Sequence, residues 1–228
     1  MKNLCIIPAR GGSKRILRKN IKEFLGKPII AYSIEAATKS GLFDEIMVST
    51  DDSEIAEIAK QYGASVPFMR SAQTANDFAT TRDVLDEVLA EYKKNGKSFD
   101  TMCCFYATAP LISAQDVTDA YNRLMQSNFN CVYPVVQFSY PIWRCLDVAA
   151  DGSMKRHWPE YENSRSQDLP KEYHDTGTFY WYKLKNNAIL SGKSGAIIVS
   201  EECMQDIDTE TDWKLAELKF QLLNGLKA

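Results

Sequence analysis

The feature that most constrains the fold of this chain is a regular alternation between short apolar runs and stretches with helical periodicity. Residues 3–8 form an apolar run before a Gly-Gly pair, which predicts a strand buried on both faces. A helix that Pro28 opens follows, with apolar side chains at Ile30 and Ile34, and Gly41 stands where a C-terminal cap belongs.

The same alternation continues along the chain. We expect further strands at 45–50, 65–69, 101–106, 131–136, 178–182 and 196–199. Helices are expected at 53–62 after a cap at Asp52 or Ser53, at 81–92, at 117–125, and at 212–224 with Leu215, Leu218 and Leu222 facing inward. This order predicts a doubly wound α/β domain with a mostly parallel, twisted sheet and helices on both faces, in which ligands bind at the carboxyl ends of strands.

The length of 228 residues fits one domain, 1–228, with a single elaboration. Between about 139 and 182 the pattern changes, because three of the four tryptophans, both histidines and three prolines occur there without a sustained period. We interpret this segment as an inserted arm. Its aromatic content is typical of a substrate lid, a subunit interface or a satellite core under a long loop.

Apolar stretches in this sequence are short. None approaches 18 residues, and the first is too short for the core of a signal peptide, so we expect a cytoplasmic protein that does not enter a membrane. The six cysteines are expected to be reduced core residues rather than disulfides or zinc ligands.

Charge is distributed unevenly along the chain. The net charge of −3 argues against broad binding of nucleic acid or membranes. Residues 1–28, however, carry eight Lys or Arg and one Glu, whereas the remaining 200 residues have a net charge of −10. This asymmetry indicates a small, highly anionic ligand.

The segment from Pro8 to Asn20 follows the first strand, combines two glycines with five cations and ends in an amide. Glycines let backbone N–H groups approach an anion closely, and Arg and Lys compensate its charge, so the segment favours a polyphosphate. It matches neither the P-loop nor the G-x-G-x-x-G fingerprint. The alternative is a solvated basic loop or a contact with an anionic surface.

Two further groups of polar residues are candidates for chemistry. An extended backbone would place Asp206 and Asp208 on one side, where paired carboxylates suit Mg²⁺ beside a triphosphate, although Asp208 or Thr209 could instead cap the last helix. The polar residues at 165–170 and 173–177 would suit an acidic sugar, or form a solvated loop with one structural His–Asp contact. Weaker candidates near strand ends are 50–52, Arg70, Thr80 and Thr81.

These residues together resemble the cytidylyltransferases that activate nine-carbon acidic sugars, the CMP-sialic acid synthetases. The resemblance runs nearly end to end and is anchored at 7–14, 19–20, 48–52 and 206–210. Within that family the chain looks closest to the branch that uses pseudaminic acid, through 13–16, 165–169, 173–175 and 205–209.

Two departures argue against ordinary sialic acid as the substrate. Sialic acid enzymes commonly have Gln-Pro-Thr-Ser-Pro-Leu-Arg where this chain has Tyr-Ala-Thr-Ala-Pro-Leu-Ile at 106–112. The usual Asn-Gly near the sugar is replaced by Thr176-Gly177.

The resemblance implies a nucleotide-diphospho-sugar transferase fold and a reaction in which CTP and pseudaminic acid yield CMP-pseudaminic acid and pyrophosphate, with Mg²⁺ as the cofactor. It also implies a homodimer whose arm helps to complete the neighbouring site. Catalytic roles would fall to Arg10, Lys14, Lys19 and Asp208. The nucleotide would contact Ala9, Arg10, Gly11, Lys19 and Asn20, with Arg70 and Thr80 near the cytidine. The sugar would face Tyr106, Gln167, His174 and Asp175, and the metal would bind Asp206 and Asp208.

The sequence leaves two alternative functions open. One is a synthetase for CMP-N-acetylneuraminate or CMP-legionaminate, and another is a catalytically silent nucleotide-binding protein. No general base is identified, and His174 is only a candidate. The resemblance suggests flagellin or surface glycans as the destination of the activated sugar.

Overall fold

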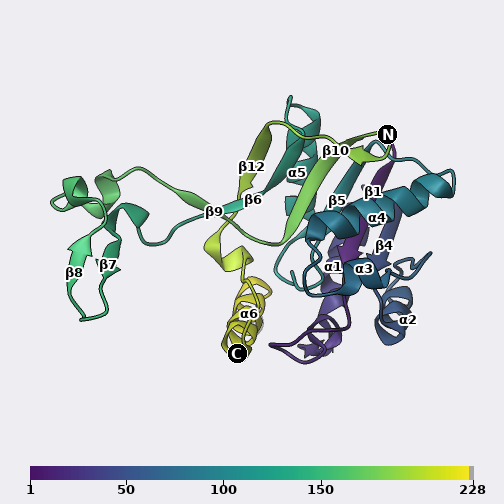
Figure 1. Ribbon diagram of the computed structural model, residues 1–228, viewed down its shortest axis with the longest axis horizontal. Coiled ribbons are helices and arrows are strands. Elements are labelled where there is room, and N and C mark those ends of the chain that lie inside the picture. Colours follow the sequence, from purple (N-terminus) through teal and green to yellow (C-terminus); the bar gives the residue numbers. More distant parts are fainter. Residues whose placement is uncertain (226–228) are drawn as a thin grey trace.

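The computed structural model describes residues 1–225 and is built around one central sheet (Figure 1). The sheet has the order β12–β6–β10–β5–β1–β4, with β9 paired to β6 and β11 paired to β10. The strands of the main path are β1 (Asn3–Pro8), β4 (Glu45–Ser49), β5 (Thr101–Phe105), β6 (Cys131–Gln137), β10 (Phe179–Lys185) and β12 (Ser194–Ile198). The short strands at its margin are β9 (Tyr173–Asp175) and β11 (Ala188–Ile189).

The sheet is mixed but mostly parallel, as predicted. The pairs β1–β4, β1–β5 and β6–β12 are parallel, whereas β10 runs antiparallel to both β5 and β6. This reversal arises because the chain leaves the sheet at the carboxyl end of β6 and returns at the same end through β9 and β10.

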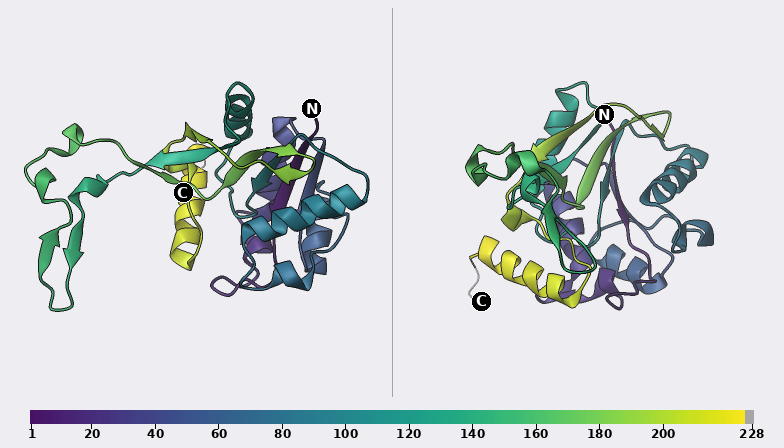
Figure 2. Two further views of the ribbon diagram at one scale, coloured as in Figure 1. Left: turned by 45° about the horizontal axis from the view of Figure 1, so that its top comes forward. Right: turned by 60° about the vertical axis from the view of Figure 1, so that its left-hand side comes forward.

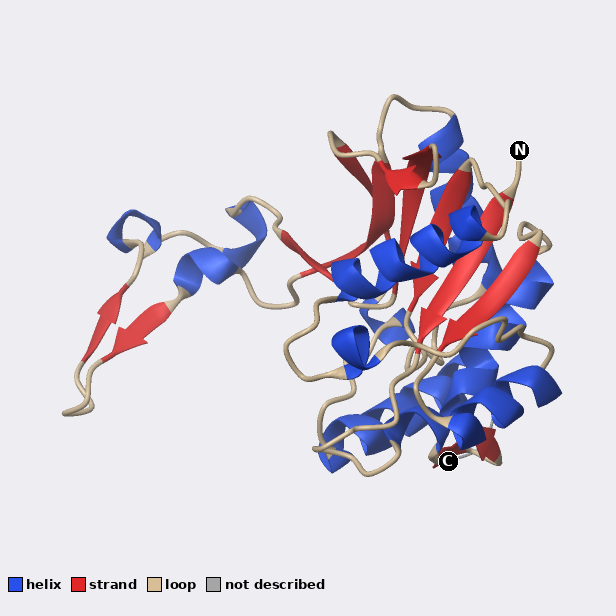
Figure 3. Ribbon diagram, turned by 45° about the vertical axis from the view of Figure 1, so that its right-hand side comes forward, coloured by secondary structure: helices blue, strands red, loops and turns tan. Residues whose placement is uncertain are grey.

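Helices cover both faces of the sheet (Figure 3). Helices α1 (Ile29–Ser40), α2 (Ser53–Gln61) and α5 (Ala114–Met125) pack in one apolar cluster with Cys5 and Ile7 of β1. Helix α4 (Thr81–Lys94) packs against Leu4 and Ile6 on the opposite face. Successive side chains of a strand point to opposite faces, so this one apolar run supplies both layers of the core.

The remaining elements are short or peripheral. They are η1 (Lys19–Ile21), the β2–β3 hairpin (Glu23–Phe24 and Lys27–Pro28), α3 (Ala72–Ala75), η5 (Glu201–Cys203) and α6 (Glu210–Leu223). Two predicted helix signals are confirmed. Gly41 ends α1 with a left-handed φ of 65°, and the Asp52 carboxylate caps α2 by accepting from the N–H groups of Glu54 and Ile55.

The predicted strand at 65–69 is wrong. Only Ser65 bridges to β4, through its N–H to Ile46 and its carbonyl to the N–H of Val48. Pro67 lacks an N–H donor two residues later, so the ladder does not continue.

The predicted inward face of the last helix is also wrong. Leu215, Leu218 and Leu222 are 43%, 54% and 67% exposed, whereas Trp213 and Ala216 are buried. Both sets have the same i, i+3 spacing, so periodicity could not distinguish them. The larger aromatic surface of Trp213 decides the rotation, because it packs against Phe24 with ring centroids 5.6 Å apart.

The aromatic-rich segment projects from the sheet as an arm (Figure 2). The expected range of 139–182 is longer than the projecting part, because β9 and residues 179–182 of β10 lie within it and belong to the central sheet. Its elements are η2 (Ile142–Arg144), the hairpin β7–β8 (Leu146–Val148 and Met154–Arg156), η3 (Pro159–Tyr161) and η4 (Ser166–Asp168). Trp143 packs at a tilt against Trp158 and Tyr161, with ring centroids 5.2 and 5.3 Å away, and all three side chains are partly exposed.

All six cysteines are free thiols, as predicted. Cys5, Cys103 and Cys104 are buried, but Cys145 is exposed on the arm, so the core interpretation fails for that residue. No helix among residues 1–225 has the length and apolar character needed to cross a bilayer.

Candidate functional site

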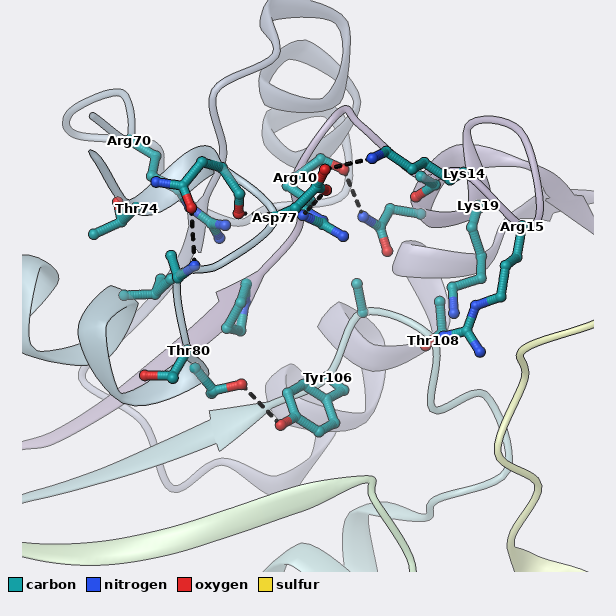
Figure 4. Close-up of a pocket in the computed structure, with 18 of the residues that line it drawn as sticks. Arg10, Lys14, Arg15, Lys19, Arg70, Thr74, Asp77, Thr80, Tyr106 and Thr108 are labelled. Carbon is teal, nitrogen blue, oxygen red and sulfur yellow. Dashed lines mark hydrogen bonds and ion pairs between the residues drawn. The ribbon is translucent and has the colours of Figure 1, made fainter. Parts of the chain in front are cut away.

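A pocket of about 610 Å³ opens where β1 and β5 end, at the sheet edge that the sequence predicted (Figure 4). The basic loop after β1 forms one wall, and the segment 70–81 before α4 forms the opposite wall. Predicted site residues that line this pocket are Arg10, Lys14, Lys19, Asn20, Arg70, Thr80, Tyr106 and Asp206.

Ala9 and Asn20 shape the basic loop from within. The N–H of Ala9 donates to the carbonyl of Ser49 on β4, 2.9 Å away, and Ala9 is fully buried. The Asn20 amide donates to the carbonyl of Arg10, also at 2.9 Å. Ala9 is absent from the pocket wall, whereas Asn20 lines it and uses its amide to fix the backbone turn that presents Arg10.

Gly11 lies against the start of α2. Its N–H donates to the Asp51 carboxylate at 3.0 Å, and a Cβ at this position would come within 2.7 Å of Asp52 Oδ2. Asp52 is itself held by the α2 cap and by the guanidinium of Arg18, whose hydrogen bonds lower the pKa of Asp52. Gly11 is therefore required by close packing, and it does not line the pocket.

The cations of the loop are each paired with a carboxylate from elsewhere in the fold. Arg10 Nη1 lies 2.9 Å from Asp77 Oδ1, and Lys14 contacts the other oxygen of Asp77 (Figure 4). Arg15 lies 2.7 Å from Asp208. Folding thus brings acidic residues to the segment that is strongly positive in sequence.

Lys19 joins the basic loop to the predicted metal pair. Its ammonium group donates to the carbonyl of Ile207 at 2.6 Å and lies 3.6 Å from Asp208 Oδ1. Burial and the charge of Asp208 together raise the pKa of Asp206, which places the two carboxylates in one electrostatic environment. The structure therefore brings Lys19, Asp206 and Asp208 together.

The helix-capping alternative belongs to Thr209. Its hydroxyl accepts from the N–H of Asp212, and the Asp212 carboxylate accepts from the Thr209 N–H, so these two residues form the capping box of α6. The Asp208 carboxylate does not participate and faces Arg15 and Lys19 instead. Helix capping therefore does not engage the Asp208 carboxylate, which is paired with cations of the basic loop.

Arg70 and Thr80 lie on the wall opposite the basic loop. Arg70 is 8% exposed and donates from Nε to Ser49 Oγ at 3.1 Å and from Nη2 to the Ser49 carbonyl at 2.6 Å. Desolvation lowers the pKa of this guanidinium, and Asp51 opposes that effect. Thr80 caps α4 in a capping box with Asp83, so its hydroxyl is already engaged.

Tyr106 follows β5 and lies beside the start of α4. Its hydroxyl is 3.0 Å from Thr81 Oγ1, and its ring meets Tyr180 edge-on with centroids 5.9 Å apart. The Tyr180 hydroxyl donates to Asp175 at 2.6 Å, and Asp175 also accepts from the N–H of Gly177, which lines the pocket. Asp175 therefore holds the Gly177 turn at the pocket wall, although Asp175 itself does not line the pocket.

The other two predicted sugar residues do not reach this pocket within one chain. His174 packs on Phe138, with centroids 4.8 Å apart, and its Nδ1 lies 2.9 Å from the Asp175 carbonyl. Gln167 lies in η4 of the arm. The pocket wall includes neither residue.

Sequence reasoning assigned no role to several residues that line the pocket: Ser13, Arg15, Thr74, Asn76, Asp77 and Thr108. Arg15 is one of the five cations of the basic segment that the sequence singled out. The pairing of Asp77 with Arg10 and Lys14 had no signal, because 67 and 63 positions separate these residues.

A doubly wound sheet with clustered cations at its strand ends, next to the loop that carries Asp206 and Asp208, is typical of a domain that binds a nucleotide. The cytidylyltransferase family model matches residues 4–176, and this chain belongs to that family. The predicted enzyme class, a nucleotidyltransferase that uses CTP, is confirmed by this membership and by the relatives described next.

Relatives of similar length support the same family. A pseudaminic acid cytidylyltransferase of Campylobacter jejuni is 41% identical over 226 residues, which cover 97% of each chain. A CMP-N,N'-diacetyllegionaminic acid synthase of the same species is 34% identical, over 97% of this chain and 96% of that protein. The predicted resemblance to CMP-sialic acid synthetases, and to the pseudaminic acid branch in particular, is confirmed.

Solved structures confirm the predicted fold class. A CMP:2-keto-3-deoxy-manno-octonic acid synthetase complexed with CTP superposes with a TM-score of 0.70 at 19% identity, covering 99% of this chain and 100% of that one. A 4-diphosphocytidyl-2C-methyl-D-erythritol synthase of Anaerococcus prevotii gives a TM-score of 0.61 at 14% identity.

Proposed function

We propose that this chain transfers the cytidylyl group of CTP to pseudaminic acid, yielding CMP-pseudaminic acid and pyrophosphate. The observation that carries the proposal is the junction of Lys19 with the Asp206–Asp208 segment at the edge of the basic pocket. The pseudaminic acid relative at 41% identity supports this sugar over the legionaminic acid relative at 34%.

The pocket divides into three parts that match the parts of the reaction. Arg70 and Thr80 would receive the cytidine, and the cations of the basic loop would receive the phosphates. Tyr106 and the Gly177 turn that Asp175 supports would receive the sugar. With this order, the anomeric hydroxyl of the sugar would lie next to the α-phosphorus for in-line attack.

Arg10, Lys14 and Lys19 would stabilise negative charge as the bond to the departing pyrophosphate breaks. For each of these cations, a phosphate oxygen would replace or share its present carboxylate or carbonyl partner. Asn20 would keep the Arg10 carbonyl, and therefore the loop, in place throughout the reaction.

Asp206 and Asp208 fit the requirements of a Mg²⁺ site. Two carboxylates are a common protein contribution to this ion, which completes its shell with water and phosphate oxygens. Burial, and then the charge of Asp208, raise the pKa of Asp206, and a bound cation would offset both effects. When bound, Mg²⁺ would supply charge compensation for the α-phosphate and lower the pKa of the attacking hydroxyl.

We further propose a homodimer, because the arm leaves Leu146, Val148 and Met154 48%, 67% and 66% exposed on its hairpin. The arm of a partner subunit is also a route by which Gln167 would reach a pocket. A cytoplasmic location is supported by six cysteines that remain thiols.

The proposal is tested by measuring pyrophosphate release from CTP and Mg²⁺ with pseudaminic, legionaminic or N-acetylneuraminic acid, with mass spectrometry of the product. Release only with pseudaminic acid is expected. Release with another sugar would retain the mechanism and change the substrate. No release with any of the three would favour a nucleotide-binding role without catalysis.

A further inference from the structure

We propose that Asp77 is a built-in competitor of the nucleotide: its carboxylate binds the same two cations as the phosphates, and CTP must displace it. The competition would weaken CTP binding and favour release of pyrophosphate. The inference rests on the proposed function, because it requires Arg10 and Lys14 to bind phosphate.

The contact spans the pocket. Arg10 Nη1 is 2.9 Å from Asp77 Oδ1, and the Lys14 ammonium contacts Asp77 Oδ2 (Figure 4). Arg10 Nη1 also donates to the carbonyl of Asn76 at 3.3 Å. Within residues 1–225, Asp77 is the one carboxylate paired with either cation. A carboxylate on both cations occupies the positions that phosphate oxygens need.

Hydrogen bonds within the turn that carries Asp77 hold its backbone in place. The side-chain oxygen of Asn76 accepts from the N–H groups of Phe78 and Ala79 at 2.8 and 2.9 Å, which forms a tight turn around Asp77. The segment is anchored before this turn by Glu87, which accepts from the N–H of Ser71 at 2.9 Å. The carboxylate is therefore presented to the pocket by ordered backbone.

The ion pairs of Asp77 with Arg10 and Lys14 can also be replaced by contacts with a ligand. The side chains of Arg10, Lys14 and Asp77 are 38%, 76% and 44% exposed, so water and ligand oxygens reach all three. Exposed pairs of this kind are weak, and a triphosphate carries several charges against the single charge of Asp77. The hydrogen bond and charge of Lys14 lower the pKa of Asp77, so it competes as an anion at neutral pH.

A second acidic contact of the basic loop shows the contrast. Asp52 binds Arg18, but its carboxylate also caps α2 and is 19% exposed, and neither residue lines the pocket. Removing Asp52 would damage the fold. Asp77 has no such role in a helix, so its charge can be removed while the turn remains.

The test compares D77N with the wild-type full-length chain by calorimetric binding of CTP and, separately, of pyrophosphate. Asparagine keeps the size of the side chain and removes its charge. D77N should bind both ligands about three- to tenfold more tightly, because two exposed ion pairs no longer compete. The gain should shrink as salt rises, because screening weakens all of these contacts.

The matched control is D86N. Asp86 pairs with Arg82 on the exposed side of α4 at 2.8 Å, and neither residue lines the pocket, so this variant removes the same charge elsewhere. It should leave both affinities unchanged. A gain in D86N equal to that in D77N would show a general charge effect and overturn the proposal.

Other outcomes are also decisive. Equal or weaker CTP binding by D77N would show that Asp77 aligns the cations instead of competing, and would overturn the inference while leaving the proposed function intact. Absence of CTP binding by the wild-type protein would overturn the proposed function itself. In a K14A background the D77N gain should be reduced, and D77A provides the same comparison if D77N does not fold.

Discussion

The ammonium group of Lys19 donates a hydrogen bond to the backbone carbonyl of Ile207, 2.6 Å away and 188 positions later in the chain. Its ammonium also lies 3.6 Å from Asp208. One side chain thus connects the loop after the first strand with the two carboxylates before the last helix. The phosphate-binding and metal-binding halves of the proposed reaction meet at this residue.

Replacing Lys19 should therefore impair catalysis. We expect Lys19→Ala to lower kcat/KM for CTP by about 10²–10³, the usual effect of losing one preorganised charge at a developing anion. Steady-state pyrophosphate release at limiting CTP measures this. Lys39→Ala, which removes a 72% exposed lysine of α1, is the control and should keep full activity. Unchanged turnover in Lys19→Ala would remove this lysine from the mechanism.

Asp208 and Thr209 separate metal binding from helix capping. Asp208→Asn should abolish Mg²⁺-dependent activity with little loss of stability, because its carboxylate is outside the capping box. Thr209→Ala should lose about 1 kcal/mol of unfolding free energy and retain activity. Thermal unfolding and turnover are measured on both variants. An inactive Asp208→Asn that is also largely unfolded would return Asp208 to a structural role.

The raised pKa of Asp206 predicts that the stability of the fold depends on pH. Its folded-state pKa is raised above 3.8 by burial and by Asp208, so its favourable contribution is present at low pH and is lost as pH rises through the folded pKa. Without Mg²⁺, Asp206→Asn should therefore melt slightly higher than wild type at pH 7, on the order of 1 °C, and equally below about pH 3.8. Mg²⁺ should raise the melting temperature of wild type only. A lower melting temperature for the variant at pH 7 without Mg²⁺ would contradict this sign.

Two adjacent glycines provide a matched test of the loop. Gly11→Ala would bring Cβ within 2.7 Å of Asp52 Oδ2, whereas Gly12→Ala meets nothing within 4 Å. We expect Gly11→Ala to cost about 1–3 kcal/mol of unfolding free energy and to weaken CTP binding, because the clash disturbs the α2 cap. Gly12→Ala should be nearly neutral in stability. Chemical denaturation and calorimetry measure both, and equal stability losses would argue against close packing at Gly11.

The orientation of α6 is tested by its two apolar faces. Trp213→Ala should destabilise the fold by about 3–5 kcal/mol, because it empties a buried aromatic cluster. Leu218→Ala, at 54% exposure, should cost less than about 1 kcal/mol. Denaturant titrations provide the comparison. A larger loss for Leu218→Ala would indicate that the leucine face is covered in solution.

Local sequence was sufficient to predict a strand or helix where one physical effect dominates. Every strand of the main path and the four helices α1, α2, α4 and α5 were predicted, because apolar periodicity sets which residues can be buried. The prediction of a strand at 65–69 was wrong because Pro67 has no N–H to donate to a ladder, whatever the apolar character of its neighbours. The last helix was predicted, but its buried face was not, because two apolar stripes had equal spacing and contact with Phe24 selected the one with Trp213.

The sequence by itself determined that cations and glycines cluster after the first strand and that two aspartates lie two positions apart before the last helix, because these are properties of local sequence. Only the tertiary structure decided how those charges are compensated. It brings Asp77 to Arg10 and Lys14, and Asp208 to Arg15, across separations that no local pattern encodes. Electrostatic interaction depends on distance in space, and folding sets that distance through the packing of the sheet and helices.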